Sequence, residues 1–240
     1  MAIWSKKTRN FFVSSIIAAA GKGTRMNLDI NKQYVEICQI PLLARTLSVF
    51  QDCNLIDEII LVVNKDDFIY CKQEIVDRYD FTKVKSMVTG GNTRQDSVRN
   101  GLKEVYNRAE IVLIHDGARP FIRESSIAEC INAACEYGAA CVAVPVKDTI
   151  KRADSSGFVV ETPDRSQLWQ IQTPQAFKYD LILDAHKKAF EDGFYGTDDA
   201  VLVERLGYRL KLVRGSYNNI KITTAEDLLL AEAIIENKLI

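Results

Sequence analysis

The sequence predicts an α/β fold in which helices cover both faces of an open, mostly parallel sheet. Short apolar runs rich in β-branched residues, such as Glu58–Val63 (EIILVV) and Ile111–His115 (IVLIH), alternate along the chain with segments of helical periodicity. These runs are apolar throughout rather than at every second position, which is typical of strands buried on both faces. In such sheets ligands bind at the carboxyl ends of the strands, so a functional site is expected in the loops that follow them.

Strands and helices are expected to alternate regularly through the first part of the chain. After a first apolar run, for example, Leu43, Leu47 and Phe50 recur at helical spacing. A later helix has Ser125 and Ser126 as candidate N-caps. The expected strands cover residues 13–19, 58–63, 84–89, 111–115 and 141–146, and the expected helices cover 41–51, 66–77, 96–106 and 125–137.

The pattern changes between Lys147 and Trp169. A turn cluster at 154–157 (DSSG) separates two short β-prone runs, 149–152 and 158–162, which predicts a β-hairpin. A lone hairpin is marginally stable in water, so we expect it to pack against another surface, with a second subunit as the candidate. Helices at 179–191 and 198–206, a strand at 209–213 and a helix at 224–237 complete one domain, residues 1–240, with a β-arm at about 147–168.

The composition is that of an ordinary globular protein. Hydrophobic residues make up 47% of the chain and charged residues 26%, and the net charge is -1. This small net charge excludes the broad basic field that nonspecific nucleic-acid binding needs, so any anion-binding site must be local. No stretch reaches the roughly 20 apolar residues of a membrane span, so no membrane partner is expected.

The cysteines and the N-terminal region indicate a cytoplasmic protein. The six cysteines form no CxxC pair and there are only two histidines, which argues against a Cys/His zinc site and for buried, reduced thiols. Lys6, Lys7 and Arg9 before an apolar run imitate a secretory signal. That run leads directly into a glycine-containing loop and a folded-domain pattern, so cleavage is not expected.

The loop from Ala18 to Met26 (AAAGKGTRM) is the first candidate binding element. Small residues and glycines let the backbone approach a ligand and point several N–H groups at one anion. Arg25 adds a permanent charge able to hold two phosphate oxygens. The dinucleotide fingerprint fails because Met26 occupies its third glycine position, and the Walker A pattern is absent. Taken alone, the loop is also explained as a tight turn with surface Lys and Arg.

Further motifs carry candidate residues, each with a structural alternative. Lys32 in NKQY could reach the same phosphates or lie on the surface, and the segment 90–98 (GGNTRQDSV) could hold a base or ribose edge or cap a helix. Asp116 in HDGARP follows a buried strand, where it could orient a Mg²⁺–phosphate unit or a substrate hydroxyl, or pair with Arg119. His115 is more typical of a packed strand end than of a catalytic base, and Lys221 in NIKIT is unremarkable alone.

In combination and in this order, the motifs resemble the family of cytidylyltransferases that act on sugar-alcohol phosphates. The resemblance covers nearly the whole chain and rests on AAAGKGTRM, NKQY, GGNTRQDSV, HDGARPF, PVKDTIKR, QTPQAF, TDDA and NIKITTAEDL. It implies a Rossmann-like nucleotidyltransferase fold of the glycosyltransferase-A-like kind. Asn31 stands where many relatives have Pro, and Gly117 where many have Ala. Neither difference removes a charge or a hydrogen-bond acceptor.

The resemblance implies that CMP moves from CTP to 2-C-methyl-D-erythritol 4-phosphate, with release of pyrophosphate, in the non-mevalonate route to isoprenoids. Such a displacement places negative charge on phosphate oxygens, so preorganised cations and N–H donors are needed rather than a covalent nucleophile. Mg²⁺ would be held mainly by the CTP phosphates, with Asp116 as a candidate protein ligand. In the family, Thr149 and Arg165 reach the neighbouring subunit's site from the arm, which implies a homodimer.

The site residues carried over from the family form three groups. They are Arg25, Lys32 and Lys221 as catalytic cations; Ala18, Ala19, Ala20, Gly21, Gly23, Gly91, Asn92 and Ser97 as the CTP cradle; and Asp116, Arg119, Thr149, Arg165, Thr173 and Thr197 as the site of the alcohol phosphate.

Three other functions compete with this reading. Ribitol-5-phosphate cytidylyltransferases share the first loop, the GG segment and the NIK motif, but their relatives usually carry Val where this chain has Ala118. An NAD-dependent dehydrogenase is suggested by the strand and glycine loop alone, and the broken fingerprint argues against it. A noncatalytic nucleotide-binding protein would gain little from three cations crowded around the reacting phosphorus.

Overall fold

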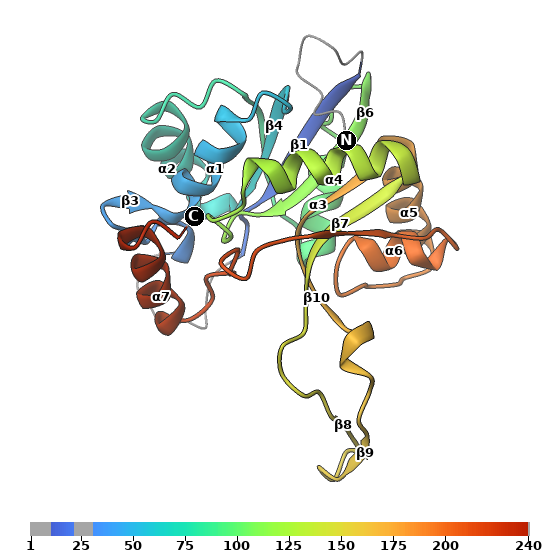
Figure 1. Cartoon of the computed structure of the whole chain (residues 1–240). Helices are drawn as coiled ribbons and strands as arrows, with labels where there is room; N and C mark the ends of the chain where they lie inside the picture. Colours follow the sequence, from blue (N-terminus) through green and yellow to red (C-terminus); the bar gives the residue numbers. More distant parts are fainter. Residues whose placement is uncertain (1–10, 22–30, 240) are drawn as a thin grey trace.

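Figure 1 shows the computed structural model, which describes residues 11–21 and 31–239, as a twisted sheet flanked by helices with an arm extending from one end. The seven strands are ordered β11-β7-β10-β6-β1-β4-β5. β10 is antiparallel to its two neighbours and all other pairs are parallel, so the predicted open, mostly parallel sheet is confirmed. The strands are β1 (Phe12–Ala18), β4 (Glu58–Val63), β5 (Val84–Thr89), β6 (Ala109–Asp116), β7 (Ala139–Pro145), β10 (Trp169–Lys178) and β11 (Lys211–Arg214).

Two apolar layers, one on each face of the sheet, form most of the core. α1, α4 and the helical segment before β5 share one buried cluster, which includes Phe50 and Ile131. α3, α5 and α6 share the other, which includes Leu102 and Phe177. α7 packs on a smaller third cluster beside the β2–β3 hairpin, Glu36–Ile37 and Ile40–Pro41. The helices are α1 (Leu42–Asp52), α2 (Phe68–Tyr70), α3 (Arg94–Leu102), α4 (Glu124–Tyr137), α5 (Tyr179–Glu191), α6 (Ala200–Arg205) and α7 (Ala225–Glu236).

Most predicted elements are confirmed, and the differences have local causes. The expected helix at 66–77 is divided into a 3-10 turn, the short α2 and a π-helical segment, Cys71–Asp77. α3 begins at Arg94, before its predicted start, because Thr93 and Asp96 form a reciprocal capping box. The predicted serine caps of α4 are wrong, because Arg123 occupies the N-cap position without a side-chain hydrogen bond.

β10 is the strand of the seven-stranded sheet that the sequence pattern did not predict. Its sequence, WQIQTPQAFK, lacks the continuous apolar run of the other central strands. Gln172, Thr173 and Gln175 are nevertheless buried, because they hydrogen-bond to neighbouring loops and side chains. The register with β7 shifts between Ile171 and Gln175, and Pro174 lies in this irregular stretch, where the ladder tolerates a missing donor. Buried polar side chains therefore concealed a central strand.

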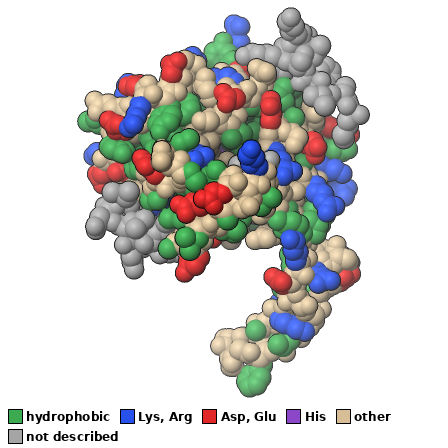
Figure 2. All heavy atoms as spheres, turned by 60° about the vertical axis from the view of Figure 1, so that its left-hand side comes forward, with side chains coloured by type: hydrophobic (Ala, Val, Ile, Leu, Met, Phe, Trp, Pro, Cys, Tyr) green, Lys and Arg blue, Asp and Glu red, His purple; other side chains and the backbone are tan. Residues whose placement is uncertain are grey.

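The arm leaves the body between β7 and β10 (Figure 1), and the space-filling view shows it projecting from the rest of the molecule (Figure 2). It contains the predicted hairpin, β8 (Arg152–Ala153) paired with β9 (Val159–Glu161), and a short 3-10 turn, Arg165–Gln167. Phe158, at the turn end of the hairpin, is 72% exposed. In this part of the chain the sequence pattern correctly predicted a break in the sheet and a projecting hairpin.

No helix in residues 11–21 and 31–239 is long and apolar enough to cross a bilayer.

Candidate active site

A cavity of about 470 Å³ opens at the carboxyl ends of β1, β4, β5 and β6, where the sequence analysis expected a site. Segments far apart in the sequence meet there, because parallel strands deliver their following loops to the same edge. The volume is of the order found for sites that take small molecules. The residues lining it are Ala18, Ala20, Gly21, Lys32, Gln33, Asn64, Lys65, Gly90, Gly91, Asn92, Thr93, Arg94, Ser97, Asp116, Ala118 and Lys221.

The first loop lines the cavity with backbone and small side chains. Ala18, Ala20 and Gly21 face it, whereas Ala19 is buried in the core. Backbone hydrogen bonds tie the loop to its neighbours. The Ala19 N–H donates to the Val62 carbonyl at 2.8 Å, and the Ala18 carbonyl accepts from the Gly117 N–H at 2.9 Å. The predicted residues Gly23 and Arg25 lie outside the described part of the chain.

The loop between β5 and α3 also lines the cavity, next to the first loop, and requires glycine. A Cβ at Gly90 would overlap that of Ala20 and lie 2.9 Å from the hydroxyl oxygen of Ser97. That hydroxyl accepts from the Gly91 N–H at 3.0 Å and donates to the Thr93 carbonyl at 2.9 Å. Ser97 therefore holds the loop in shape, and its single hydroxyl hydrogen is already used.

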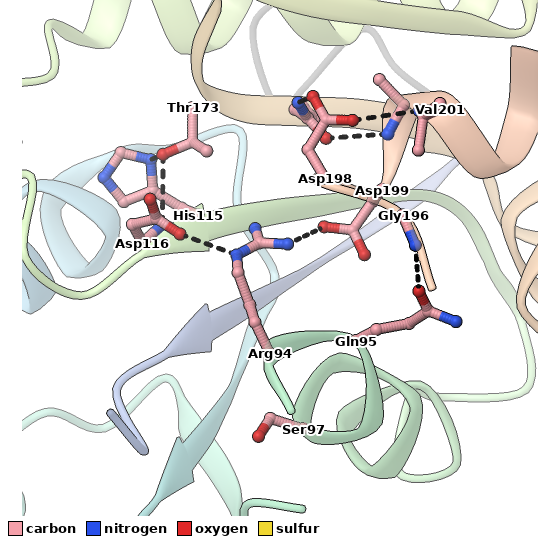
Figure 3. A network of polar contacts seen from close by, with 12 residues as sticks. Arg94, Gln95, Ser97, His115, Asp116, Thr173, Gly196, Asp198, Asp199 and Val201 are labelled. Atoms are coloured by element: carbon pink, nitrogen blue, oxygen red, sulfur yellow. Dashed lines mark hydrogen bonds and ion pairs between the residues drawn. The ribbon is translucent and has the colours of Figure 1, made fainter. Parts of the chain in front are cut away.

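Three cationic side chains surround Asp116, and Figure 3 shows one of them, Arg94, between Asp116 and Asp199. Oδ1 of Asp116 lies 3.1 Å from Nε of Arg94, and its Oδ2 lies 2.7 Å from Nζ of Lys221 and 3.7 Å from Nε of Arg119. Arg94 also reaches a second carboxylate, with Nη1 2.6 Å from Oδ2 of Asp199. Two carboxylates thus face three permanent cations, which leaves the cluster with a net positive charge suited to phosphate.

The protonation states follow from this arrangement. Burial acts to raise the pKa of Asp116, but Arg94, Lys221 and Arg119 outweigh it and hold the pKa well below its usual range. Burial has the same effect on Asp199, and Arg94 and His186 likewise keep its pKa low. Both carboxylates are therefore ionised at neutral pH.

His115 is a packed residue that supports its neighbours, as the sequence analysis expected. Burial lowers its pKa from 6.5 to about 4, so the ring is neutral at pH 7. Its Nε2 lies 3.0 Å from the Arg119 carbonyl and must carry the proton, which leaves Nδ1 to accept from the Thr173 hydroxyl at 2.9 Å. The same hydroxyl accepts from the Asp116 N–H at 3.1 Å. The single hydroxyl hydrogen of Thr173 is therefore already used.

The segment between β11 and α7 brings Lys221 to the cavity. Arg119 donates to the Asn219 carbonyl at 2.8 Å, and the Asn219 side chain donates to the Thr173 carbonyl at 3.0 Å. Lys32, which is 7% exposed, donates to the Ile222 carbonyl at 3.2 Å. Lys32 and Lys221 therefore reach the same cavity although 189 positions separate them in the sequence.

Of the six predicted residues of the alcohol-phosphate group, Asp116 lines this cavity, Arg119 and Thr173 contact Asp116 beside it, and the other three lie away from it. Thr149 and Arg165 are exposed on the arm, where Nη1 of Arg165 donates to the Lys147 carbonyl at 2.7 Å. Thr197 is exposed in the turn before α6 and does not line the cavity. Of that group, Asp116, Arg119 and Thr173 are brought together by the fold of this one chain.

Arg94 and Asp199 are residues of the site that the sequence reasoning missed. A signal for Arg94 exists: Thr93 and Asp96 have the spacing of a capping box, which places Arg94 in the first turn of a helix that follows a strand. Asp199 offers no such signal, because its contact with Arg94 joins positions 105 residues apart.

The described residues offer no built cage for a metal. Among residues 11–21 and 31–239 no group of three or more His, Cys, Asp or Glu side chains could hold an ion. Both oxygens of Asp116 already have cationic partners, so a divalent cation bound directly there would face Arg94 and Lys221. The arrangement fits a metal brought and held by a polyphosphate better than one held by Asp116.

Comparisons with known proteins agree with this geometry. A family model described as IspD: 2-C-methyl-D-erythritol 4-phosphate cytidylyltransferase matches residues 13–237. Relatives of that name include one from Caldanaerobacter subterraneus subsp. tengcongensis, 50% identical over 93% of this chain and 98% of its own. Another, from Clostridium novyi, is 52% identical over 93% and 96% of the two chains.

Solved structures show the same likeness. The 4-diphosphocytidyl-2C-methyl-D-erythritol synthase from Anaerococcus prevotii has a TM-score of 0.85 and 39% identity, and the match covers 94% of this chain and 96% of the other. The 2-C-methyl-D-erythritol 4-phosphate cytidylyltransferase from Thermus thermophilus has a TM-score of 0.78 and 32% identity, covering 94% and 100% of the two chains.

Proposed function

This chain belongs to the 2-C-methyl-D-erythritol 4-phosphate cytidylyltransferase family, and from that premise we propose how its residues divide the work of the reaction. The enzyme transfers CMP from CTP to 2-C-methyl-D-erythritol 4-phosphate, giving 4-diphosphocytidyl-2-C-methyl-D-erythritol and pyrophosphate. One observation carries the assignment of this chemistry to the cavity. Lys221 and Asp116 meet at 2.7 Å beside the glycine-containing loops, where a polyphosphate and a hydroxylated acceptor can lie side by side.

The cations provide the chemical assistance. An oxygen of the acceptor phosphate attacks the α-phosphorus of CTP, and the bond to the oxygen that leads to the β-phosphate breaks. That acceptor oxygen is already ionised near pH 7, so no general base is required. Lys221 and Lys32, with Arg25 from outside the described residues, would stabilise the negative charge that builds on the α-phosphate oxygens. Lys221, with 36% of its side chain exposed, can exchange the Asp116 oxygen for a phosphate oxygen.

The two substrates would occupy different walls of the cavity. We assign CTP to the loops that contain Ala18–Gly21 and Gly91–Ser97, because their backbone groups and small side chains permit close contact. We assign the acceptor to Asp116, Arg119 and Thr173. Asp116 and Thr173 offer oxygens to acceptor hydroxyls, and Arg119 offers positive charge to its phosphate. Thr197 would join them from the turn before α6.

Mg²⁺ is proposed as the cofactor, held mainly by CTP. Bound to the triphosphate, it would neutralise charge on the phosphate oxygens. The pairing of both Asp116 oxygens with cations supports a role for this carboxylate toward the acceptor hydroxyls rather than as a principal metal ligand.

A homodimer is proposed to complete the acceptor site. The hairpin extends from the body with exposed Phe158, Val159 and Val160. Thr149 and Arg165 lie on this arm outside their own cavity, which supports their use in a neighbouring subunit. We also propose that the enzyme works in the cytoplasm, a location supported by its six free cysteine thiols.

Pyrophosphate release measured with each acceptor tests the function. The purified protein with CTP and Mg²⁺ is expected to release pyrophosphate with 2-C-methyl-D-erythritol 4-phosphate and to do so far more slowly with ribitol 5-phosphate. Turnover with ribitol 5-phosphate alone would contradict the assignment. Omission of the acceptor is the control, and it should abolish release.

A further inference from the structure

Arg94 links the nucleotide wall of the cavity to the acceptor wall. It is the first residue of α3, directly after the loop that contains Gly91 and Asn92. Its guanidinium spans two carboxylates, with Nε 3.1 Å from Asp116 and Nη1 2.6 Å from Asp199 (Figure 3). Because a guanidinium is planar and its donors are fixed, this double contact sets the orientation of both partners.

Asp199 and His186 anchor Arg94 from behind. Each of these two side chains is 1% exposed, and Nε2 of His186 lies 3.0 Å from Oδ1 of Asp199. His186 is in α5, and Asp199 immediately precedes α6. A buried carboxylate is stable only when it is paired, so Asp199 holds the guanidinium in one place. α5, through His186, and the segment before α6, through Asp199, therefore support Arg94 from behind the site.

The contact with Arg94 affects how Asp116 pairs with Lys221. Arg94 takes Oδ1 of Asp116 and leaves Oδ2 to Lys221. Without Arg94, the whole carboxylate charge would be balanced by Lys221 and Arg119, and Lys221 would be held more tightly away from the phosphate. The carboxylate would also be free to turn away from an acceptor hydroxyl.

We propose that Arg94, anchored by Asp199 and His186, is a positioning residue that fixes Asp116 for the acceptor and leaves Lys221 free to reach the α-phosphate. This inference rests on the reaction assigned above. Loss of a positioning residue should lower kcat and raise KM for the acceptor. Loss of a residue that binds CTP directly should instead raise the Kd for CTP.

The test compares Arg94→Gln, Arg94→Lys and the double variant Arg94→Gln/Asp199→Asn with wild type. Arg99→Gln is the matched control, since Arg99 lies on the same helix, has similar exposure and pairs with Asp96 at 3.1 Å. For each protein, kcat, KM for the acceptor, the equilibrium Kd for CTP and the Tm are measured. Absence of activity in the wild type would contradict the proposed reaction, whereas the ratio of each variant's values to the wild-type values tests the role of Arg94.

We expect Arg94→Gln to lower kcat/KM for the acceptor roughly 100-fold while the Kd for CTP changes less than about threefold. Arg94→Lys should fall between Arg94→Gln and wild type, because an ammonium can hold one carboxylate but not both in a fixed plane. Arg99→Gln should match wild type in all kinetic values.

The double variant separates positioning from simple support of the fold. Arg94→Gln leaves Asp199 buried beside His186 alone, so its Tm should fall. Adding Asp199→Asn removes that unpaired charge and should restore part of the Tm without restoring kcat/KM for the acceptor. Recovery of activity together with Tm would overturn the proposal. An Arg94→Gln variant whose Kd for CTP rises by the same factor by which its kcat/KM for the acceptor falls would also overturn the proposal.

Discussion

Asp116 is the residue on which the charges of the site converge. Burial alone would favour its neutral form, yet three cations keep its pKa low and its carboxylate ionised. It therefore serves as a permanent acceptor of hydrogen bonds and as a resting partner for Lys221, 2.7 Å away. In the reaction proposed above, Lys221 would exchange this carboxylate oxygen for an oxygen of the α-phosphate as negative charge builds there.

Replacement of Lys221 should affect turnover more than CTP binding. Its charge is most useful when negative charge builds on the α-phosphate, so Lys221→Ala should lower kcat roughly 100- to 1000-fold. The Kd for CTP, measured by calorimetry, should change less than about threefold. Lys188→Ala is the control, since Lys188 forms a surface pair with Asp192 at 2.8 Å. Equal losses in kcat and CTP affinity would mean that Lys221 binds CTP before the reaction and gives the transition state no additional stabilisation.

The buried, neutral His115 should make stability depend on pH. Its folded-state pKa of about 4 lies below its ordinary value of 6.5, so between these values the unfolded chain binds a proton that the folded chain does not. Stability is therefore lost as pH falls below about 6.5, by about 2 kcal/mol between pH 7 and pH 5. Urea unfolding at the two pH values measures this loss. In His115→Gln the loss should shrink; an unchanged pH dependence would assign it to other groups.

Sequence reasoning at the level of residues succeeded where charge and strand position coincided. Asp116 and Arg119 follow a buried strand. Asp116 lines the cavity with Lys32 and Lys221, and Arg119 and Thr173 contact Asp116 beside it. Their roles remain predictions, as does that of Arg25, which lies outside the described residues. The partner of Arg94 could not be foreseen, because only the folded chain brings Asp199 to it.

The loops and helices around the site depend on close backbone approach, which two glycines illustrate. Gly90 packs between Ala20 and Ser97, at the cavity wall. Gly101, on α3, packs against the sheet, where a Cβ would lie 2.8 Å from Ile16 and 3.1 Å from Val62. The first glycine shapes the part of the cavity that we assign to CTP, and the second lets the helix that carries Arg94 sit directly on the strands.

Alanine at these two positions should have different effects. Gly101→Ala should lower the free energy of unfolding by about 1–3 kcal/mol through overpacking, with the Kd for CTP nearly unchanged. Gly90→Ala should weaken CTP binding at least about tenfold with a smaller loss of stability, because the two nucleotide loops must separate. Chemical unfolding and calorimetry distinguish the two. If both variants lost only stability, the Gly90 loop would not form a nucleotide wall.

At the level of elements, the length of the apolar runs and their lack of alternation correctly predicted the strands that are apolar throughout. β4 and β5 begin and end as predicted, and so does α5. β10 was missed because its buried glutamines and threonine are satisfied by side-chain and loop partners that no local pattern reveals. The capping box of α3 was visible in the sequence and would have corrected the start of that helix.

The molecule as a whole combines a rigid sheet with an arm that makes few contacts with its own body. The hairpin residues Phe158, Val159 and Val160 are exposed, and a two-stranded hairpin has little stability by itself. The break in sheet pattern allowed the arm to be predicted from sequence. Its packing on a second subunit was expected from the marginal stability of a lone hairpin and from the family resemblance, and it stays a prediction.

Subunit complementation tests the arm's proposed role. Arg165→Ala should disable the arm and Lys221→Ala the cavity, so each homodimer should be nearly inactive. Mixed after reversible dissociation, the two variants should regain about a quarter of wild-type activity, because half of the dimers are mixed and each has one intact site. A mixture as inactive as its components would indicate that the arm serves its own subunit's cavity. Unmixed variants carried through the same treatment are the controls.

The most direct test of the reaction is a single turnover of CTP labelled with phosphorus-32 at the α-position. With enzyme in excess and both substrates bound, the label should pass from CTP to the cytidylylated acceptor at one rate, and none should remain on acid-quenched protein. This is the result of direct displacement in a site built from cations and N–H donors. Label trapped on the protein, or released from CTP without the acceptor, would contradict that mechanism.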